Sequence, residues 1–498
     1  MNIIIQKAKN GEDTALAENL FLHSNYAPSK EAERFVENLN IPYTPSSIII
    51  TEPGLSYIAA PLKKKYPDIK LGAIRYTEDF SSFNKSFDFI INYFEIQNLE
   101  NYLLSKYNEE ELLSIFFLSW QPSSKAFADT DKACWTSIKN TLERAKTLLV
   151  TRQYFEKKWI INTFNFLKYI KKPVIYSKEG LSSIKKDILI IASGPSLNDS
   201  INIIKEKADS FFIICLSSAI SACFKNNIIP DLCFSTDGGY WAGEHFKKIN
   251  RHNIVLALPS EGYCKKYLLE NNFILPLNYD DGISKILIEE SGLEYLHAER
   301  NGTVTGTALK FAIQYFNSNI YLCGVDLASN KGLQHIQPNE LEINNCLKDN
   351  RINTKEKRNS AAEFSGDSLK IYLEWFQSQN FNFQDKKIYR VINENRRKNT
   401  LGSIIDINSK EFSEAIKNNT SASIKKSNEF LTIQKTKIDI EKIFNNFEKE
   451  CVEKNFKKLL FPLDFVSLSH NLENSDIKEK IEERYNNLIQ KIRKIIYD

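Results

Sequence analysis

The chain has 498 residues, of which 42% are hydrophobic, so several buried cores are expected at roughly 100 to 200 residues per domain. Lysine and arginine number 66 and the acids 62, and the resulting charge of +4 argues against a general nucleic-acid or membrane-surface binder. Eight scattered cysteines without a CxxC pair favour reduced thiols, and therefore a cytoplasmic protein. A secretory signal is not expected, because the N-terminus has one short apolar run followed by acids, and a membrane span is not expected, because the longest apolar stretch is too short and contains serines.

The first part of the chain alternates short β-like runs with helical ones. Strands are predicted within 46–51, 69–76, 87–94 and 112–120. This rhythm indicates a small α/β domain at 1–125. From about Asp129 to Ile170 there is no proline or glycine, and apolar residues recur at helical spacing, which predicts a long connecting helix within a linker segment at 126–178.

The central part carries continuous apolar runs that each end in small or polar residues: "DILIIASGPS", "FFIICLSS", "PDLCFSTDGG", "NIVLALPS" and "NIYLCGVD". Strands of this kind are typical of a parallel sheet that helices cover on both faces. They predict a Rossmann-like α/β domain at 179–400, with ligands bound beyond the carboxyl ends of the strands.

After about residue 400 the pattern changes to long polar helices. Ser475 is a plausible helix cap, and an apolar stripe follows it. The stripe comprises Ile477, Ile481, Tyr485, Leu488, Ile492 and Ile495. A helical C-terminal domain is therefore predicted at 401–498, and its helices are the expected contact surface if the chain forms a homo-oligomer.

The turn after the first central strand is a candidate anion site. Gly194 lets the backbone approach a ligand, Pro195 suits the first turn of a helix, and Ser193 and Ser196 offer hydroxyl donors. A tight strand-to-helix turn with capping serines is an equally good interpretation of these residues. The turn matches neither a Walker loop nor the three-glycine dinucleotide motif.

A second hydroxyl-rich turn, "NGTVTGT", precedes the apolar helix that begins near Ala308. Gly302, Thr303, Thr305 and Thr307 predict another helix N-terminus suited to phosphate or ribose. The alternative is a capping region, which is weakened because β-branched threonines are poor turn residues unless their hydroxyls are used.

Two acids and one histidine complete the candidate site. Asp237 and Asp326 each follow a central strand, where a carboxylate accepts from ribose hydroxyls, orients a base or holds a neighbouring loop amide. His335 lies in a polar loop after the Asp326 strand, where a general base above the two turns would be useful. No histidine pair has metal-ligand spacing, so no metal site is predicted.

Taken in order, "IIASGPSL", "PDLCFSTDG", "GTVTGTAL…NIYLCGVDLA" and "GLQH" resemble the central domain of motility-associated factor (Maf) proteins, the flagellin glycosyltransferases. That domain is similar to bacterial sialyltransferases and to pterin diphosphokinases. The N-terminal "LFLHSNYAPSKEAERF" resembles another motif of the same family, and "FSGDSLKIYLEWFQ" and "IYRVINE" also follow its order. The resemblance covers about residues 15–400.

The resemblance implies a transferase that moves a nonulosonic acid of the pseudaminic or legionaminic type from a CMP-activated donor to Ser or Thr of flagellin. Ser193, Gly194 and Ser196 would hold the nucleotide phosphate, with Thr303, Thr305 and Thr307 completing the cradle. Asp237 would meet ribose or cytosine, and His335 matches the sialyltransferase base. An inverting reaction that requires no metal or other cofactor is expected.

The sequence departs from the family pattern in two places. Ala192 and Ser193 stand where relatives more often have Gly-Ala or Gly-Asn, and "INENRRKNTLGS" from residue 392 keeps only Asn393 and Gly402 of a glycine-rich run. Tyr240 is a candidate leaving-group acid. The alternative functions are a pterin-type diphosphokinase, with Asp199, Asp231 and Asp237 as available metal ligands, and a nonenzymatic flagellin chaperone.

Overall fold

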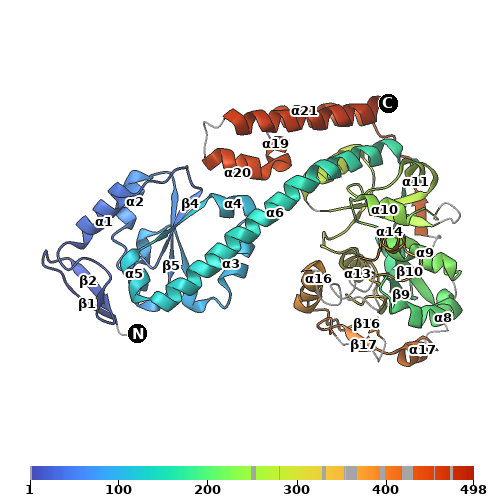
Figure 1. Ribbon diagram of the computed structural model, residues 1–498, viewed down its shortest axis with the longest axis horizontal. Helices are drawn as coiled ribbons and strands as arrows, with labels where there is room; N and C mark the ends of the chain where they lie inside the picture. Colours follow the sequence, from blue (N-terminus) through green and yellow to red (C-terminus); the bar gives the residue numbers. More distant parts are fainter. Residues whose placement is uncertain are drawn as a thin grey trace. The chain divides into compact units, whose positions relative to one another are not determined.

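The computed structural model describes residues 3–247, 249, 254–279, 281–327, 333–352, 354, 367–392, 399–417, 430–453, 455–470 and 475–498. The chain divides into two compact units, unit 1 (Met1–Glu156 with Lys454–Asn487) and unit 2 (Lys157–Glu453 with Leu488–Asp498). The C-terminal segment is largely helical, as predicted. Its helices are shared between the units, however, and two strands also fall within it (Figure 1).

Unit 1 contains a four-stranded parallel sheet of order β6-β5-β4-β7 and a three-stranded antiparallel sheet, β1-β2-β3. Its elements are β1 (Ile3–Lys7), β2 (Asp13–Ala17), β3 (Leu20–Phe21), α1 (Pro28–Asn38), β4 (Ser47–Thr51), α2 (Ala59–Lys65), β5 (Lys70–Arg75), η1 (Glu78–Ser86), β6 (Phe89–Asn92), η2 (Tyr93–Glu95), α3 (Leu99–Lys106), α4 (Glu109–Ser114), β7 (Ile115–Ser119), α5 (Gln121–Ala126), α19 (Asn455–Leu460) and α20 (Pro462–His470). Two helices have residues in both units, α6 (Ala128–Tyr169) and α21 (Ser475–Tyr497).

The predicted α/β character of unit 1 is confirmed. The four parallel strands lie within the four predicted ranges, and every residue of β4 is buried because helices cover both faces of the sheet. The long helix predicted from Asp129 to Ile170 is α6, which is 42 residues long. The antiparallel β1-β2-β3 sheet was not predicted.

The N-terminal motif that resembles the Maf family builds the start of α1. Ser24 Oγ accepts hydrogen bonds from the amides of Tyr26 and Ala27, and the Glu31 carboxylate accepts from the amide of Ser24 at 2.7 Å. The buried His23 ring accepts from the amide of Leu55 through Nε2 at 2.8 Å. In this unit the motif ties a helix start to the loop after β4.

We expect His23 to make unit 1 sensitive to acid. Burial, with a smaller contribution from the charge of Arg75, lowers the pKa of His23 from 6.5 to about 3. Between about pH 6.5 and 3, His23 is therefore protonated in the unfolded chain but neutral in the folded chain. Because the unfolded state binds more protons in this window, the free energy of unfolding falls as the pH decreases through it. The expected loss is about 1.4 kcal/mol per pH unit. Urea unfolding of the wild type and His23→Gln between about pH 7 and 5 should show a shallower pH dependence in the variant, and equal slopes would contradict the assignment.

Unit 2 contains a nine-stranded parallel sheet and a two-stranded antiparallel one, β18-β8. Its elements are β8 (Val174–Tyr176), α7 (Lys178–Ser182), β9 (Asp187–Ile191), α8 (Leu197–Lys207), η3 (Ala208–Ser210), β10 (Phe211–Leu216), η4 (Ser217–Ala219), α9 (Ile220–Lys225), β11 (Leu232–Phe234), α10 (Tyr240–His245), β12 (Val255–Pro259), α11 (Lys266–Asn271), β13 (Phe273–Asn278), α12 (Gly282–Ser291), β14 (Leu296–His297), α13 (Val304–Tyr315), β15 (Ile320–Cys323), α14 (Glu340–Leu347), α16 (Asp367–Ser378), β16 (Ile388–Val391), β17 (Ile405–Ile407), α17 (Ser409–Lys417), β18 (Leu431–Ile433) and α18 (Ile440–Val452).

The strand order of the large sheet is β14-β13-β12-β11-β10-β9-β15-β16-β17. The first strand of this sheet in the sequence is β9, and the strands from β10 to β14 follow one beside the other on one side of it. The chain then crosses back, and β15 pairs with the other side of β9. The order therefore reverses between β9 and β15, and ligands of doubly wound sheets bind beyond the carboxyl ends of the strands at such a point. The predicted Rossmann-like central domain is confirmed.

Helices cover both faces of this sheet. On one face, α13 packs against Ile188, Ile190 and Phe212. On the other face, Phe412 of α17 contacts Phe211 and Tyr321, and α17 in turn packs on α8. The alternating residues of β9, β10 and β15 thus serve two different layers, which explains their unbroken apolar runs.

The apolar stripe predicted for the last helix lies on α21. Ile481, Tyr485, Leu488 and Ile492 are buried, whereas Ile477 and Ile495 are partly exposed. Within the described ranges, no helix combines the length and apolar character needed to cross a bilayer. Cytoplasmic location and homo-oligomer formation stay predictions.

Candidate functional site

The loops that follow β9 and β15 lie against each other at the point where the strand order reverses. The amide of Ala192 donates to the carbonyl of Cys323 at 2.8 Å, and the amide of Gly194 donates to that of Gly324 at 2.7 Å. A Cβ on Gly194 would overlap the Gly324 carbonyl, and Gly324 has a φ of +73° besides facing the Ala192 carbonyl. Both glycines are therefore required by close backbone approach.

Asp326 occupies the N-terminal end of α8. Its Oδ2 accepts a hydrogen bond from the amide of Ser196 at 2.7 Å, and the amide of Leu197 donates to the carbonyl of Gly194 at 3.1 Å. A carboxylate is stabilised there by the positive end of the helix dipole. In this conformation, the amides of Gly194 and Ser196, predicted to cradle a phosphate, donate to protein acceptors instead. Pro195 has no amide proton, and the hydroxyls of Ser193 and Ser196 are further candidate donors in this turn.

Those hydroxyls connect the β9 loop to the β10 loop. Ser218, in η4, donates through Oγ to Ser193 Oγ at 2.9 Å. Ser196 Oγ is buried and has no partner within the described part of the chain. The structure thus adds Ser218, which the sequence did not single out, to the predicted turn.

The segment that carries His335 crosses the ends of β9 and β10. The amide of Ile336 donates to the carbonyl of Ser193 at 2.7 Å, and Asn339 Nδ2 donates to the carbonyl of Ser218 at 2.9 Å. These two bonds bring His335 beside the predicted turn. The structure therefore places Ser193, Gly194, Ser196 and Asp326 together with the segment of His335, although they lie up to 142 positions apart in the sequence.

His335 is paired with a buried carboxylate. Its Nδ1 lies 3.1 Å from Glu342 Oε1, and the side chains are 22% and 2% exposed. The same oxygen accepts from the amides of Gln334 at 2.9 Å and His335 at 3.2 Å. Burial raises the pKa of Glu342, but the hydrogen bonds from His335 and the amides outweigh it and hold that pKa below its usual value.

A second histidine and Asp237 lie near this pair. Burial and, to a smaller extent, the nearby charge of His335 lower the pKa of His245 to about 4, although the negative charges of Asp237 and Glu244 act in the opposite direction and raise it. Asp237 follows β11, and its Oδ1 accepts from the amide of Gly239 at 2.8 Å. His245 ends α10, which packs against both η4 and α14. The helix also carries Tyr240, which is 59% exposed.

In the threonine-rich turn the Thr303 hydroxyl caps the helix that follows, whereas Thr307 Oγ1 is buried with no partner in the described part of the chain. Thr303 caps α13, with Oγ1 accepting from the amide of Gly306 at 2.8 Å, and Asn301 Oδ1 accepts from the amide of Thr303 at 3.3 Å. Thr307 is buried, Thr305 is partly buried and Gly302 is exposed. Because α13 leads through a short turn into β15, it begins at the carboxyl edge of the sheet, as α8 does. The two helices nevertheless cover opposite faces, and the bonds that join the β9 loop, the β15 loop and the His335 segment do not include this turn.

A polar network that the sequence did not reveal covers the ends of β11 to β14. Arg300 makes a bidentate pair with Glu261 at 2.7 and 2.9 Å and lies 4.5 Å from the ring centroids of both Trp159 and Tyr279. Asn162 of α6 donates to the carbonyls of Glu261 and Gly238. Five separate segments supply these groups, so no sequence motif predicts them. Their charges and donors pair with one another, which indicates a structural role.

Glu342 and His245 also escaped sequence reasoning. Glu342 is one acid within a polar stretch, and His245 belongs to no recognisable motif in the sequence. The useful signal was their position, because both occupy helices that follow loops at the carboxyl edge. Gly332 of "GLQH" and Asn393 also lie outside the described residues.

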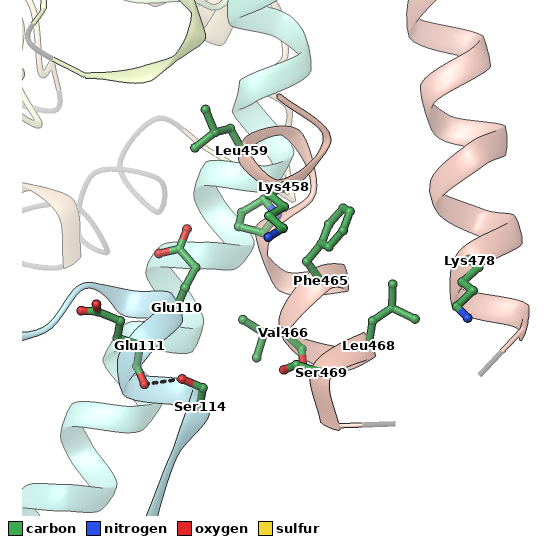
Figure 2. A pocket seen from close by; sticks show the side chains of 11 residues that line it. Glu110, Glu111, Ser114, Lys458, Leu459, Phe465, Val466, Leu468, Ser469 and Lys478 are labelled. Atoms are coloured by element: carbon green, nitrogen blue, oxygen red, sulfur yellow. Dashed lines mark hydrogen bonds between the residues drawn. The ribbon is translucent and has the colours of Figure 1, made fainter. Parts of the chain in front are cut away.

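Unit 1 has a cavity of about 600 Å³ that is lined by residues of α4, α19, α20 and α21 (Figure 2). Its lining is mostly apolar and includes Leu459, Phe465, Val466 and Leu468, with Glu110 and Glu111 from α4. None of the predicted site residues lines it. Among the residues that the structure describes, no group of three or more His, Cys, Asp or Glu side chains is arranged to hold a metal ion.

Comparisons with known proteins address the class to which this fold belongs. Residues 157–332 match the family described as 6-hydroxymethylpterin diphosphokinase MptE-like. A solved structure, that of a Maf glycosyltransferase from Magnetospirillum magneticum AMB-1, aligns with all of this chain and 91% of its own at a TM-score of 0.50 and 12% identity. The resemblance predicted from the sequence motifs is thus confirmed at the level of fold, which is similar to that of a Maf glycosyltransferase, and residues 157–332 are similar to the pterin diphosphokinase-like family.

A curated relative extends the comparison at the level of sequence. An uncharacterized protein of Treponema pallidum (strain Nichols) is 28% identical over 286 residues. The match covers 57% of this chain and 61% of that protein, so the chain spans less than two thirds of the length of the relative.

Proposed function

We propose that this protein is an inverting, metal-independent glycosyltransferase that moves a nonulosonic acid of the pseudaminic or legionaminic type from a CMP-activated donor to Ser or Thr of flagellin. The observation that supports it most is the His335–Glu342 pair, which lies beside the loop where the strand order reverses. The similarity of the fold to that of a Maf glycosyltransferase supports sugar transfer over the alternative functions.

The roles follow from the chemistry of the reaction. A serine hydroxyl is a weak nucleophile, and Nε2 of a neutral His335 takes its proton as it attacks the anomeric carbon. The phosphate of the leaving CMP gains negative charge, and the hydroxyls of Ser193 and Ser218 would stabilise that charge by donating hydrogen bonds. Asp237 would bind ribose or cytosine, and Asp326 would keep the β9 and β15 loops together.

Nucleotide binding tests this proposal most directly. We expect CMP and CDP to raise the thermal unfolding midpoint of the full chain in the presence of EDTA. At a ligand concentration of about 100 times Kd, the stabilisation is about 2.7 kcal/mol. A response to ATP alone that strictly requires Mg²⁺ would contradict the proposal.

The match to the MptE-like family favours a second candidate, a diphosphokinase of the pterin type. Such an enzyme uses metal ions that bridge triphosphate oxygens, so the ATP and Mg²⁺ arms of the same experiment identify it. A chain that responds to none of these nucleotides would instead fit the flagellin chaperone predicted as an alternative from the sequence.

A further inference from the structure

Within the described residues, three nitrogen atoms contact Oε1 of the Glu342 carboxylate. Oε1 accepts hydrogen bonds from the amides of Gln334 and His335 and lies next to Nδ1 of the His335 ring. The Glu342 side chain is 2% exposed. Two of these contacts come from the loop that carries the ring itself. The carboxylate therefore determines both the path of this loop and the direction of the imidazole.

An ionised carboxylate has no proton to donate. Since Oε1 accepts only, its contact with Nδ1 requires the proton to lie on Nδ1. In a neutral imidazole the other nitrogen, Nε2, then keeps its lone pair. A general base needs that lone pair, so the contact selects the form of His335 that can accept a proton.

Glu342 is itself anchored to the predicted turn. Asn339 caps α14 by accepting from the amides of Leu341 and Glu342 at 3.0 and 3.3 Å. The other end of the same amide side chain donates to the carbonyl of Ser218 at 2.9 Å, and Ser218 bonds to Ser193. The position of Glu342 is thus coupled to the loops after β9 and β10.

From these contacts we propose that Glu342 is a positioning residue that holds His335 in the Nδ1–H tautomer with Nε2 available to an acceptor hydroxyl. The inference rests on the proposed function for its catalytic meaning, but the tautomer itself does not depend on it. Glu342 contacts neither donor nor acceptor in this account and acts through the imidazole.

Long-range ¹H–¹⁵N NMR of the full chain labelled at histidine tests the tautomer, with the His335 signals assigned by their loss in His335→Asn. At alkaline pH we expect Nδ1–H and a bare Nε2 in the wild type. Glu342→Ala should shift the ring toward the Nε2–H form, and Glu342→Gln, which keeps an acceptor oxygen for the loop amides, should restore Nδ1–H. Glu340→Ala, two residues away on the same helix, is the matched control and should behave as the wild type.

An Nε2–H tautomer in the wild type, or an unchanged tautomer in a folded Glu342→Ala, would overturn the inference. The wild-type measurement keeps this test valid even if Glu342→Ala does not fold. Sugar transfer should fall about 10- to 100-fold in Glu342→Ala while CMP-induced stabilisation is retained, the usual size of such supporting effects. A wild-type chain without transferase activity but with the expected tautomer would contradict the proposed function and leave the inference about Glu342 intact.

Discussion

Replacing His335 with asparagine is expected to abolish flagellin modification while leaving nucleotide binding intact. Asparagine has no group that accepts a proton near neutral pH, so attack by the serine hydroxyl loses its general base. Such a loss costs about 10²- to 10⁴-fold in rate. Intact-mass spectrometry of flagellin from cells carrying the variant should lack the added sugar mass, and purified variant should still be stabilised by CMP.

His297→Asn provides the matched control. His297 lies at the carboxyl end of β14 in the same sheet, with β13, β12, β11 and β10 between it and β9. The same substitution there should leave the added mass unchanged. Normal decoration of flagellin by His335→Asn would refute the assignment of the base, whereas loss of CMP-induced stabilisation would indicate a damaged loop rather than a missing base.

The sequence predicted the framework of the site because strand ends are local features. An unbroken apolar run such as "ILII" followed by "ASGPS" indicates a buried strand and its exit turn without knowledge of the rest of the chain. The position of His335, in a polar loop after the strand that became β15, could be predicted from the sequence in the same way. Together these signals located the carboxyl edge of the sheet and most of the residues that meet there.

The partners of those residues could not be predicted in the same way. The acceptor to which a backbone amide donates depends on tertiary contacts. In the structure the amide of Ser196, which was predicted to bind phosphate, donates to Asp326. The Thr303 hydroxyl likewise caps its own helix. Glu342, His245 and Arg300 gain their importance only from neighbours that lie far away in sequence.

The sheet of unit 1 follows the same topological rule as that of unit 2. Its strand order reverses between β4 and β7, so the loop after β4 is where a ligand would be expected. A buried ion pair fills this place instead. Arg75 Nη1 lies 2.9 Å from Glu52 Oε1, and the two side chains are 1% and 0% exposed.

Each end of this ion pair has further partners. Arg75 also donates to the carbonyl of Gly54 and to Ser56 and Asn84, while Glu52 accepts from the amides of Gly54 and Tyr76. Burial raises the pKa of Glu52, and the opposing contributions of Arg75 and these amides favour its charged form. The pair therefore joins β4, β5 and the loop between them, which makes the edge of this sheet a structural junction.

Glu52→Gln should consequently destabilise unit 1 severely. It leaves the Arg75 guanidinium buried without its counter-charge, which costs about 3–5 kcal/mol and, for a unit of this size, lowers its unfolding midpoint by roughly 6–20 °C. Peptide-resolved hydrogen exchange should show faster exchange in β4 and β5, with β9 and β10 of unit 2 as an internal reference. Glu143→Gln removes the same charge from a pair whose side chains are 75% and 67% exposed, so its effect should be within about 0.5 kcal/mol. The loss expected for Glu52→Gln depends entirely on the desolvation of the Arg75 charge. Equal protection of the β4 and β5 amides in the two variants would therefore contradict the prediction and show that the buried pair contributes no more than the exposed one.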